Sequence, residues 1–191
     1  QNLFVNYDIN SLDKKVQNKI ELQKLLKLEV NPNIPMVGIV SRLVSQKGLD
    51  LISFMMPEIV NENLQLVVLG TGENQYQSMF HYYDSHYPSK VSANITFDSA
   101  LAQQIYAASD IFLMPSLFEP CGLSQMMSLK YGTIPIVRET GGLADSVQPY
   151  NEFEQTGTGF SFSNYNAHEM MDTIDYALHT FYDYPDAWDA I

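Results

Sequence analysis

Residues 36–52 read MVGIVSRLVSQKGLDLI and combine a short apolar run, a basic loop and the start of a helix. The run Met36–Val40 has no polar alternation, which is typical of a strand buried on both faces. Gly48 closes the loop, and the apolar spacing of Leu49–Ile59 predicts a helix. A buried strand followed at once by a helix is the repeating unit of a parallel sheet, so this segment predicts an α/β fold.

The same alternation continues along the chain. Further short apolar runs occupy 64–69, 95–97, Ile111–Met114 and 134–137, and stretches of helical periodicity occupy 14–28, 100–108, 123–131 and 167–178. Right-handed crossovers bring the carboxyl ends of such strands to one edge, where ligands of open α/β sheets bind. We therefore predict one domain with a Rossmann-like parallel sheet sandwiched by helices, and a site in the loops that follow the strands.

The amino-acid composition and net charge limit the classes of partner that the chain can bind. The chain has 191 residues, 46% of them hydrophobic, and a formal charge of -12 from 22 acidic and 10 basic side chains. This balance disfavours nucleic acid and anionic membranes as partners, since both need a basic face. With one Cys, no long apolar run and no signal-peptide pattern, we expect a cytoplasmic protein. Both ends of the chain have the pattern of truncated ends.

Two strand-end loops carry candidate phosphate ligands. Arg42 and Lys47 lie beside the N-terminus of the helix predicted after the first strand. A single Lys would be better explained as a solvated surface charge, but the two cations in one loop favour a site for a diphosphate. The loop Gly70, Thr71 and Gly72 follows the second strand and lets backbone approach a ligand closely. It is not a GxGxxG fingerprint, so it does not support a dinucleotide cofactor.

The stretch MPSLFEPCGL, residues 114–123, places Glu119 just outside the N-terminus of a predicted helix. A favourable helix-dipole contact of about 0.3–1 kcal/mol is one explanation. Pro120 also restricts Glu119 to extended backbone, and an oriented carboxylate suits hydrogen bonds to sugar hydroxyls. The loop after 134–137, which contains Thr140, Gly141 and Gly142, predicts a second anion site. A sugar diphosphate would satisfy all of these loops.

Several segments resemble the C-terminal half of bacterial glycogen synthases and plant starch synthases. They are GIVSRLVSQKGLDLI, LVVLGTGE, AASDIFLMPSLFEPCGLSQMMSLKYGTIPIVRETGGLADSV and GTGFSF, and the similarity covers about residues 12–180. The resemblance implies one lobe of a two-lobed GT-B type glycosyltransferase, with 1–191 as the C-terminal nucleotide-sugar-binding domain and 1–13 as a linker region. Such enzymes transfer glucose from ADP-glucose to the non-reducing end of an α-1,4-glucan, with retention of configuration and without a metal or other cofactor.

The resemblance also implies residue roles. Arg42 and Lys47 match the pair that neutralises the diphosphate, and Glu119 matches the carboxylate that contacts the donor glucose. Phe97 falls where the family often has Tyr near the adenine, whereas its position at the end of a predicted strand alone favours the core. The other implied donor-binding residues are Gly70, Thr71, Gly72, Cys121, Gly122, Leu123, Thr140, Gly141 and Gly142.

Two departures from the family pattern follow. Many related transferases have a second Glu where this chain has Met127, and glycogen and starch synthases commonly lack it, which leaves open what holds the ribose. The family's N-terminal lobe, with its Lys-Thr-Gly-Gly loop, a His near the sugar and the glucan acceptor site, is absent. We therefore expect this chain alone to bind ADP-glucose or ADP weakly and to be inactive. A stand-alone nucleotide- or glycan-binding module and an unrelated Rossmann-like oxidoreductase are the alternatives.

Overall fold

The computed structural model describes residues 3, 13–117, 130–139, 149–150, 157, 159–184 and 188. Within this part of the chain the strands form one parallel sheet in the order β3-β2-β1-β4-β5-β6. The strands are β1 (Met36–Val40), β2 (Gln65–Leu69), β3 (Val91–Asn94), β4 (Ile111–Met114), β5 (Ile134–Arg138) and β6 (Phe160–Phe162). The predicted parallel sheet is confirmed.

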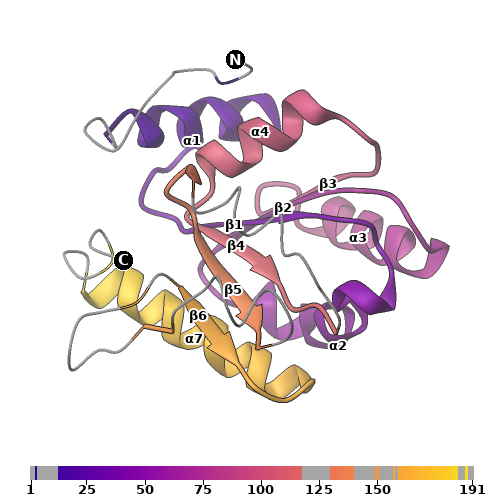
Figure 1. Ribbon diagram of the computed structural model, residues 1–191. Helices are drawn as coiled ribbons and strands as arrows, with labels where there is room; N and C mark the ends of the chain where they lie inside the picture. Colours follow the sequence, from indigo (N-terminus) through magenta and orange to yellow (C-terminus); the bar gives the residue numbers. More distant parts are fainter. Residues whose placement is uncertain are drawn as a thin grey trace.

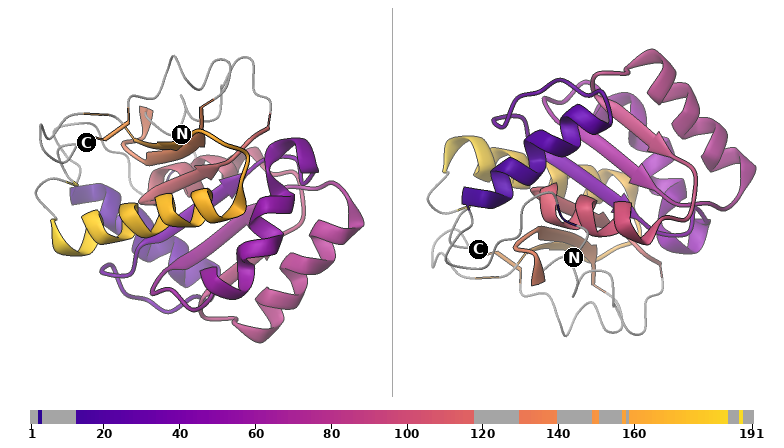
Figure 2. Two further views of the ribbon diagram at one scale, coloured as in Figure 1. Left: turned by 90° about the horizontal axis from the view of Figure 1, so that it is seen from below. Right: turned by 90° about the horizontal axis from the view of Figure 1, so that it is seen from above.

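Helices cover both faces of the sheet. They are α1 (Asp13–Leu25), the short 3-10 helix η2 (Ser45–Lys47), α2 (Leu49–Ile59), α3 (Asn74–His86), α4 (Ser99–Ala108) and α7 (Ala167–Asp183). Figure 1 shows α1 and α4 side by side on one face, with α2 and α7 on the opposite face. Figure 2 shows the same two faces from below and from above.

The side chains of the central strands alternate between the two faces. In β2, Leu66 and Val68 belong to the core cluster that includes α2, α3 and α7. Val67 and Leu69 belong to the cluster that contains Leu22 of α1. Because both faces are buried, most positions of these strands carry apolar side chains, which explains the continuous apolar runs in the sequence.

The predicted strand at 95–97 is wrong. β3 ends at Asn94, and Phe97 lies in the following loop with 92% of its surface exposed. β3 is an outer strand of the described sheet and includes Ser92 and Asn94, so it has no apolar run to mark it. The next helix is capped by Asp98, whose carboxylate accepts the Leu101 N–H at 3.0 Å.

The helical periodicity of 14–28 predicts an apolar buried face, but the buried face of α1 is largely polar. Val16 and Leu25 of α1 are exposed, whereas the polar residues Lys19 and Gln23 are buried. The Lys19 ammonium lies 2.7 Å from the Asp110 carboxylate, and Gln23 donates to the Gln65 side chain at 2.8 Å. The helix therefore packs through Leu22 together with satisfied polar groups, and a search for hydrophobic periodicity does not detect the polar part.

Candidate functional site

The loops that follow β1 and β2 are joined by backbone hydrogen bonds at the carboxyl edge of the sheet. The Ser41 N–H donates to the Leu69 carbonyl at 3.2 Å, and the Leu43 N–H donates to the Thr71 carbonyl at 2.9 Å. The Leu43 carbonyl in turn accepts the Glu73 N–H at 2.9 Å. Parallel pairing thus continues beyond the two strands, and the loop that carries Arg42 is held along its neighbour.

This pairing explains the two glycines of the second loop. A Cβ atom on Gly70, which has φ of +158°, would lie 1.9 Å from the Ser41 carbonyl oxygen. A Cβ on Gly72 would lie 2.3 Å from the Leu43 carbonyl oxygen. The glycines therefore permit a close approach between the backbones of the loops after β1 and β2. A donor-binding role for Gly70, Thr71 and Gly72 stays a prediction.

Arg42 and Lys47 both lie in the loop after β1, at the predicted edge. Arg42 is exposed, and its guanidinium makes no hydrogen bond or ion pair with the part of the chain that the structure describes. Lys47 is half-buried at the end of η2, directly before Gly48 and the N-terminus of α2. Two cations beside a helix N-terminus form a positive region suited to an anion.

The end of β4 supports η2 from one side. The Leu117 N–H donates to the Gln46 carbonyl at 2.9 Å. Gly48 has φ of +85°, and a Cβ there would lie 2.2 Å from the Pro115 carbonyl oxygen. The turn that carries Lys47 is therefore in direct contact with the segment that leads toward Glu119.

A tyrosine near the start of α7 supports η2 from another side. The Tyr165 hydroxyl lies 2.5 Å from the Asp50 carboxylate and 2.9 Å from the Ser45 carbonyl, so its single O–H is shared between the two acceptors. The Ser45 hydroxyl is itself 2.5 Å from the Tyr76 hydroxyl of α3. Burial, followed by the hydrogen bond to Asp50, raises the pKa of Tyr165, so its phenol stays a donor at ordinary pH.

Arg138, the last residue of β5, joins the same group of loops. Its Nε donates to the Ser116 carbonyl at 3.1 Å, and its Nη2 donates to the Leu117 carbonyl. The guanidinium carbon lies 5.7 Å from the centre of the Tyr165 ring, within the range of a cation–π contact. Sequence reasoning missed both residues. Arg138 follows an apolar run at a strand end, as Arg42 does, and could have been found, whereas Tyr165 has no local signal.

Phe97 lies at the same edge, in the loop between β3 and α4. Its exposure of 92% excludes the interpretation as a core residue and leaves its ring open for stacking. The remaining predicted site residues lie outside the described part of the chain: Glu119, Cys121, Gly122, Leu123, Thr140, Gly141 and Gly142. Their roles stay predictions.

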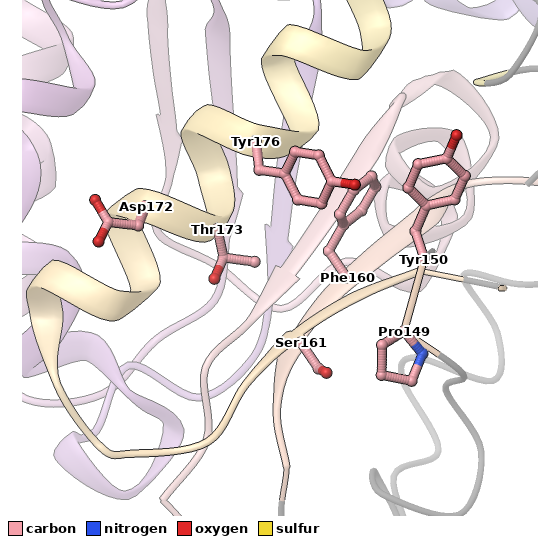
Figure 3. A pocket seen from close by; sticks show the side chains of 7 residues that line it. All are labelled: Pro149, Tyr150, Phe160, Ser161, Asp172, Thr173 and Tyr176. Atoms are coloured by element: carbon pink, nitrogen blue, oxygen red, sulfur yellow. The ribbon is translucent and has the colours of Figure 1, made fainter. Parts of the chain in front are cut away.

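A pocket of about 180 Å³ lies between β6 and α7 and includes none of the predicted donor-binding residues. It is lined by Pro149, Tyr150, Phe160, Ser161, Asp172, Thr173 and Tyr176, which Figure 3 shows as sticks. The aromatic rings of Tyr150, Phe160 and Tyr176 contact one another, with centroids 5.4–6.2 Å apart. These rings pack at the edge of the hydrophobic core, beside the outer strand β6. We assign this pocket no part in the candidate donor site.

Among the described residues, no three or more His, Cys, Asp or Glu side chains are grouped so that they could hold a metal ion. None of the helices in this part of the chain has the length and apolar character that a membrane span requires.

Comparison with known proteins identifies the family. The glycogen synthase of Clostridioides difficile (strain 630) is 63% identical over 96% of this chain, which spans 38% of that relative's length. The catalytic domain of starch synthase IV from Arabidopsis thaliana, solved with ADP and acarbose, is 34% identical over 98% of the chain and 40% of its own, with a TM-score of 0.90.

A third structure supports the fold alone. The C-terminal domain of a glycosyl transferase group 1 family protein from Francisella tularensis has a TM-score of 0.69 at 16% identity, covering 97% of this chain and 92% of its own. The resemblance to glycogen and starch synthases and the GT-B type fold are thus confirmed. The family described as "Glycosyl transferases group 1" matches residues 14–188, and the chain belongs to that family.

Proposed function

We propose that this chain is the donor-nucleotide-binding lobe of a glycogen synthase. The complete enzyme would transfer glucose from ADP-glucose to the non-reducing end of an α-1,4-glucan with retention of configuration. The observation that carries the proposal is the likeness, across 98% of the chain, to a starch synthase whose solved structure contains ADP. We expect the acceptor glucan to bind mainly through the rest of the enzyme, since the chain spans only about two fifths of its relatives' length.

The loop geometry supports a place for the donor diphosphate. Arg42 and Lys47 lie at the end of β1, beside the N-terminus of α2, and the loop is held by backbone bonds to the loop after β2. In glucose transfer, negative charge develops on the departing diphosphate. Cations that are already in place stabilise that charge without reorganisation, which lowers the barrier of the chemical step.

Glu119 completes the proposed donor site on the sugar side. It would accept hydrogen bonds from hydroxyls of the donor glucose, while Cys121, Gly122 and Leu123 would offer backbone N–H groups near the sugar. Phe97 would stack on the base. Thr140, Gly141 and Gly142 would lie beside the phosphates, and no metal ion or other cofactor is expected.

The test uses the full-length enzyme, meaning this chain joined to the remainder of the length that its relatives have. With ADP-glucose and an α-1,4-glucan, we expect glucan elongation, and Lys47→Ala should lower kcat by about 100-fold or more with a smaller change in the KM for donor. Unchanged kcat in Lys47→Ala would contradict the role of this residue.

A second measurement separates the classes of ligand. Titration with ADP, UDP and NAD, followed by melting temperature, should give the largest stabilisation with ADP. Binding of ADP without any glucose transfer would favour a nucleotide-binding module. A response to NAD with none to ADP would favour an oxidoreductase.

A further inference from the structure

The short turn η2 is only three residues long, and a turn of this length does not hold its shape through its own hydrogen bonds. The Lys47 N–H donates to the Val44 carbonyl at 3.0 Å, and the Gly48 N–H donates to the Ser45 carbonyl at 2.9 Å. Contacts from outside the turn must therefore fix the position of the Lys47 backbone.

Tyr165 supplies that support from a distant part of the chain. It lies 120 residues from Ser45 and 115 from Asp50, yet its hydroxyl reaches both, at 2.9 and 2.5 Å. Ser45 opens η2, and Asp50 lies in the first turn of α2, so the two acceptors lie on either side of Lys47. The single O–H is thus shared between an acceptor before Lys47 and one after it, which ties the two sides of the turn to the same phenol.

The ring of Tyr165 is held as well. The guanidinium of Arg138 lies against it, and that guanidinium also donates to the Ser116 and Leu117 carbonyls at the end of β4. Asn166 then caps α7 by accepting the N–H groups of His168 and Glu169. The ring of Tyr165 is therefore held by Arg138, and the backbone that follows Tyr165 is held by the cap of α7.

We propose that Tyr165 is a positioning residue for glucose transfer: its hydroxyl, through Ser45 and Asp50, holds the turn that presents Lys47 to the donor diphosphate. This inference rests on the proposed function of Lys47. A hydroxyl that acts only through Lys47 contributes to the rate by keeping the ammonium in its reactive place, because small displacements of a catalytic group lower the rate strongly.

The test is kinetic and uses the full-length enzyme. Tyr165→Phe removes one oxygen and keeps the ring over Arg138, so we expect a 3- to 10-fold lower kcat with the KM for ADP-glucose changed less than 2-fold. Tyr182→Phe is the matched control, since Tyr182 lies on α7, the helix that Tyr165 directly precedes, and its hydroxyl donates to the backbone carbonyl of Asn63 at 2.8 Å. The control should leave kcat unchanged.

A double substitution separates positioning from general stability. If Tyr165 acts through Lys47, Tyr165→Phe has no further effect on kcat once Lys47→Ala is present. Equal losses in both backgrounds would overturn the inference while leaving the proposed function intact. No loss from Lys47→Ala itself would overturn both, and a loss from Lys47→Ala with none from Tyr165→Phe would overturn this inference alone.

Hydrogen exchange gives a measurement that does not depend on activity. The N–H groups of Lys47 and Gly48 are bonded inside the turn, so their exchange reports its local opening. We expect the peptide covering 43–50 to exchange 3- to 10-fold faster in Tyr165→Phe, with no change in Tyr182→Phe. Unchanged exchange in Tyr165→Phe would overturn the positioning role even if that variant had lost activity through poor folding.

Discussion

Gly48 lies against Pro115, so close that a Cβ atom on Gly48 would come within 2.2 Å of the Pro115 carbonyl oxygen. Gly48 follows the turn that carries Lys47, and Pro115 follows β4. Because backbone fills the space on the Pro115 side, the contact cannot be relieved by moving a side chain. The loop after β1 and the loop after β4 can therefore pack this closely only because residue 48 has no Cβ atom.

The first prediction tests this contact. Gly48→Ala should lower the free energy of unfolding by about 2 kcal/mol or more, because φ of +85° and the collision with Pro115 both oppose a side chain. Urea denaturation measures the loss. Gly48→Asn separates the two causes, since Asn tolerates this backbone conformation but has the same Cβ. Near-normal stability of Gly48→Asn would show that the collision is not real.

The second prediction concerns the exposed ring of Phe97. Phe97→Ala in the full-length enzyme should raise the Kd for ADP by about 5- to 150-fold, equivalent to about 1–3 kcal/mol of lost stacking on the base. Because the side chain is 92% exposed, the melting temperature should not change. Calorimetry with ADP measures the effect, and pyrophosphate, which has no base, should bind both proteins equally.

A matched control for Phe97 is available on α2. Phe54 lies on α2, away from the loop of Phe97, and has 65% of its surface exposed. Phe54→Ala therefore makes the same chemical change at another exposed position. It should leave the Kd for ADP unchanged. Equal losses of ADP affinity in the two variants would contradict a specific platform at Phe97.

The sequence predicted the interior of the fold better than its margins. β1 and β4 coincide with the predicted runs because both faces of central strands are buried, so composition marks them. β3 is an outer strand with Ser92 and Asn94, and it was placed four residues too late. α1 packs through Lys19 and Gln23, whose partners lie in other elements and leave no periodic pattern.

The same difference holds for the site. Arg42 and Lys47 could be found because they directly follow a buried strand, and strand ends converge in any parallel sheet. Tyr165 could not, since its contact with Asp50 spans 115 residues and depends on how α7 packs on α2. Residues that follow a strand can be proposed from local sequence, whereas the tertiary contacts that hold the turn of Lys47 cannot.

The third prediction concerns the buried pair Lys19 and Asp110. Their charged atoms lie 2.7 Å apart, with side-chain exposures of 3% and 16%. Lys19→Met should lower the free energy of unfolding by about 3–5 kcal/mol, because Asp110 is left charged and largely buried. Adding Asp110→Asn should restore part of the loss, since the amide oxygen can still accept the Met36 N–H. No recovery in the double variant would contradict the assigned cause.

The last prediction is a pH dependence centred on Lys15. Its ammonium donates to the Thr133 hydroxyl at 2.7 Å and to the Ala107 carbonyl at 2.8 Å. Burial lowers the pKa of Lys15 from 10.5 to about 7; Asp110 partly offsets this shift and Lys19 adds to it. Between these two values the unfolded chain binds more protons than the folded one, so stability rises with pH and falls again as the pH drops toward 7.

The contribution of Lys15 to this slope is at most about 1.4 kcal/mol per pH unit. Urea denaturation at intervals from pH 7.5 to 9.5 should show it in the wild type and show its loss in Lys15→Met, which carries no titrating group. Lys24→Met is the control on the same helix, because Lys24 is exposed and pairs with Glu21 on the surface at 3.4 Å. Parallel curves for wild type and Lys15→Met would mean that the ammonium stays charged in the folded protein, held by the acceptors around it, among them the Tyr106 carbonyl at 3.3 Å.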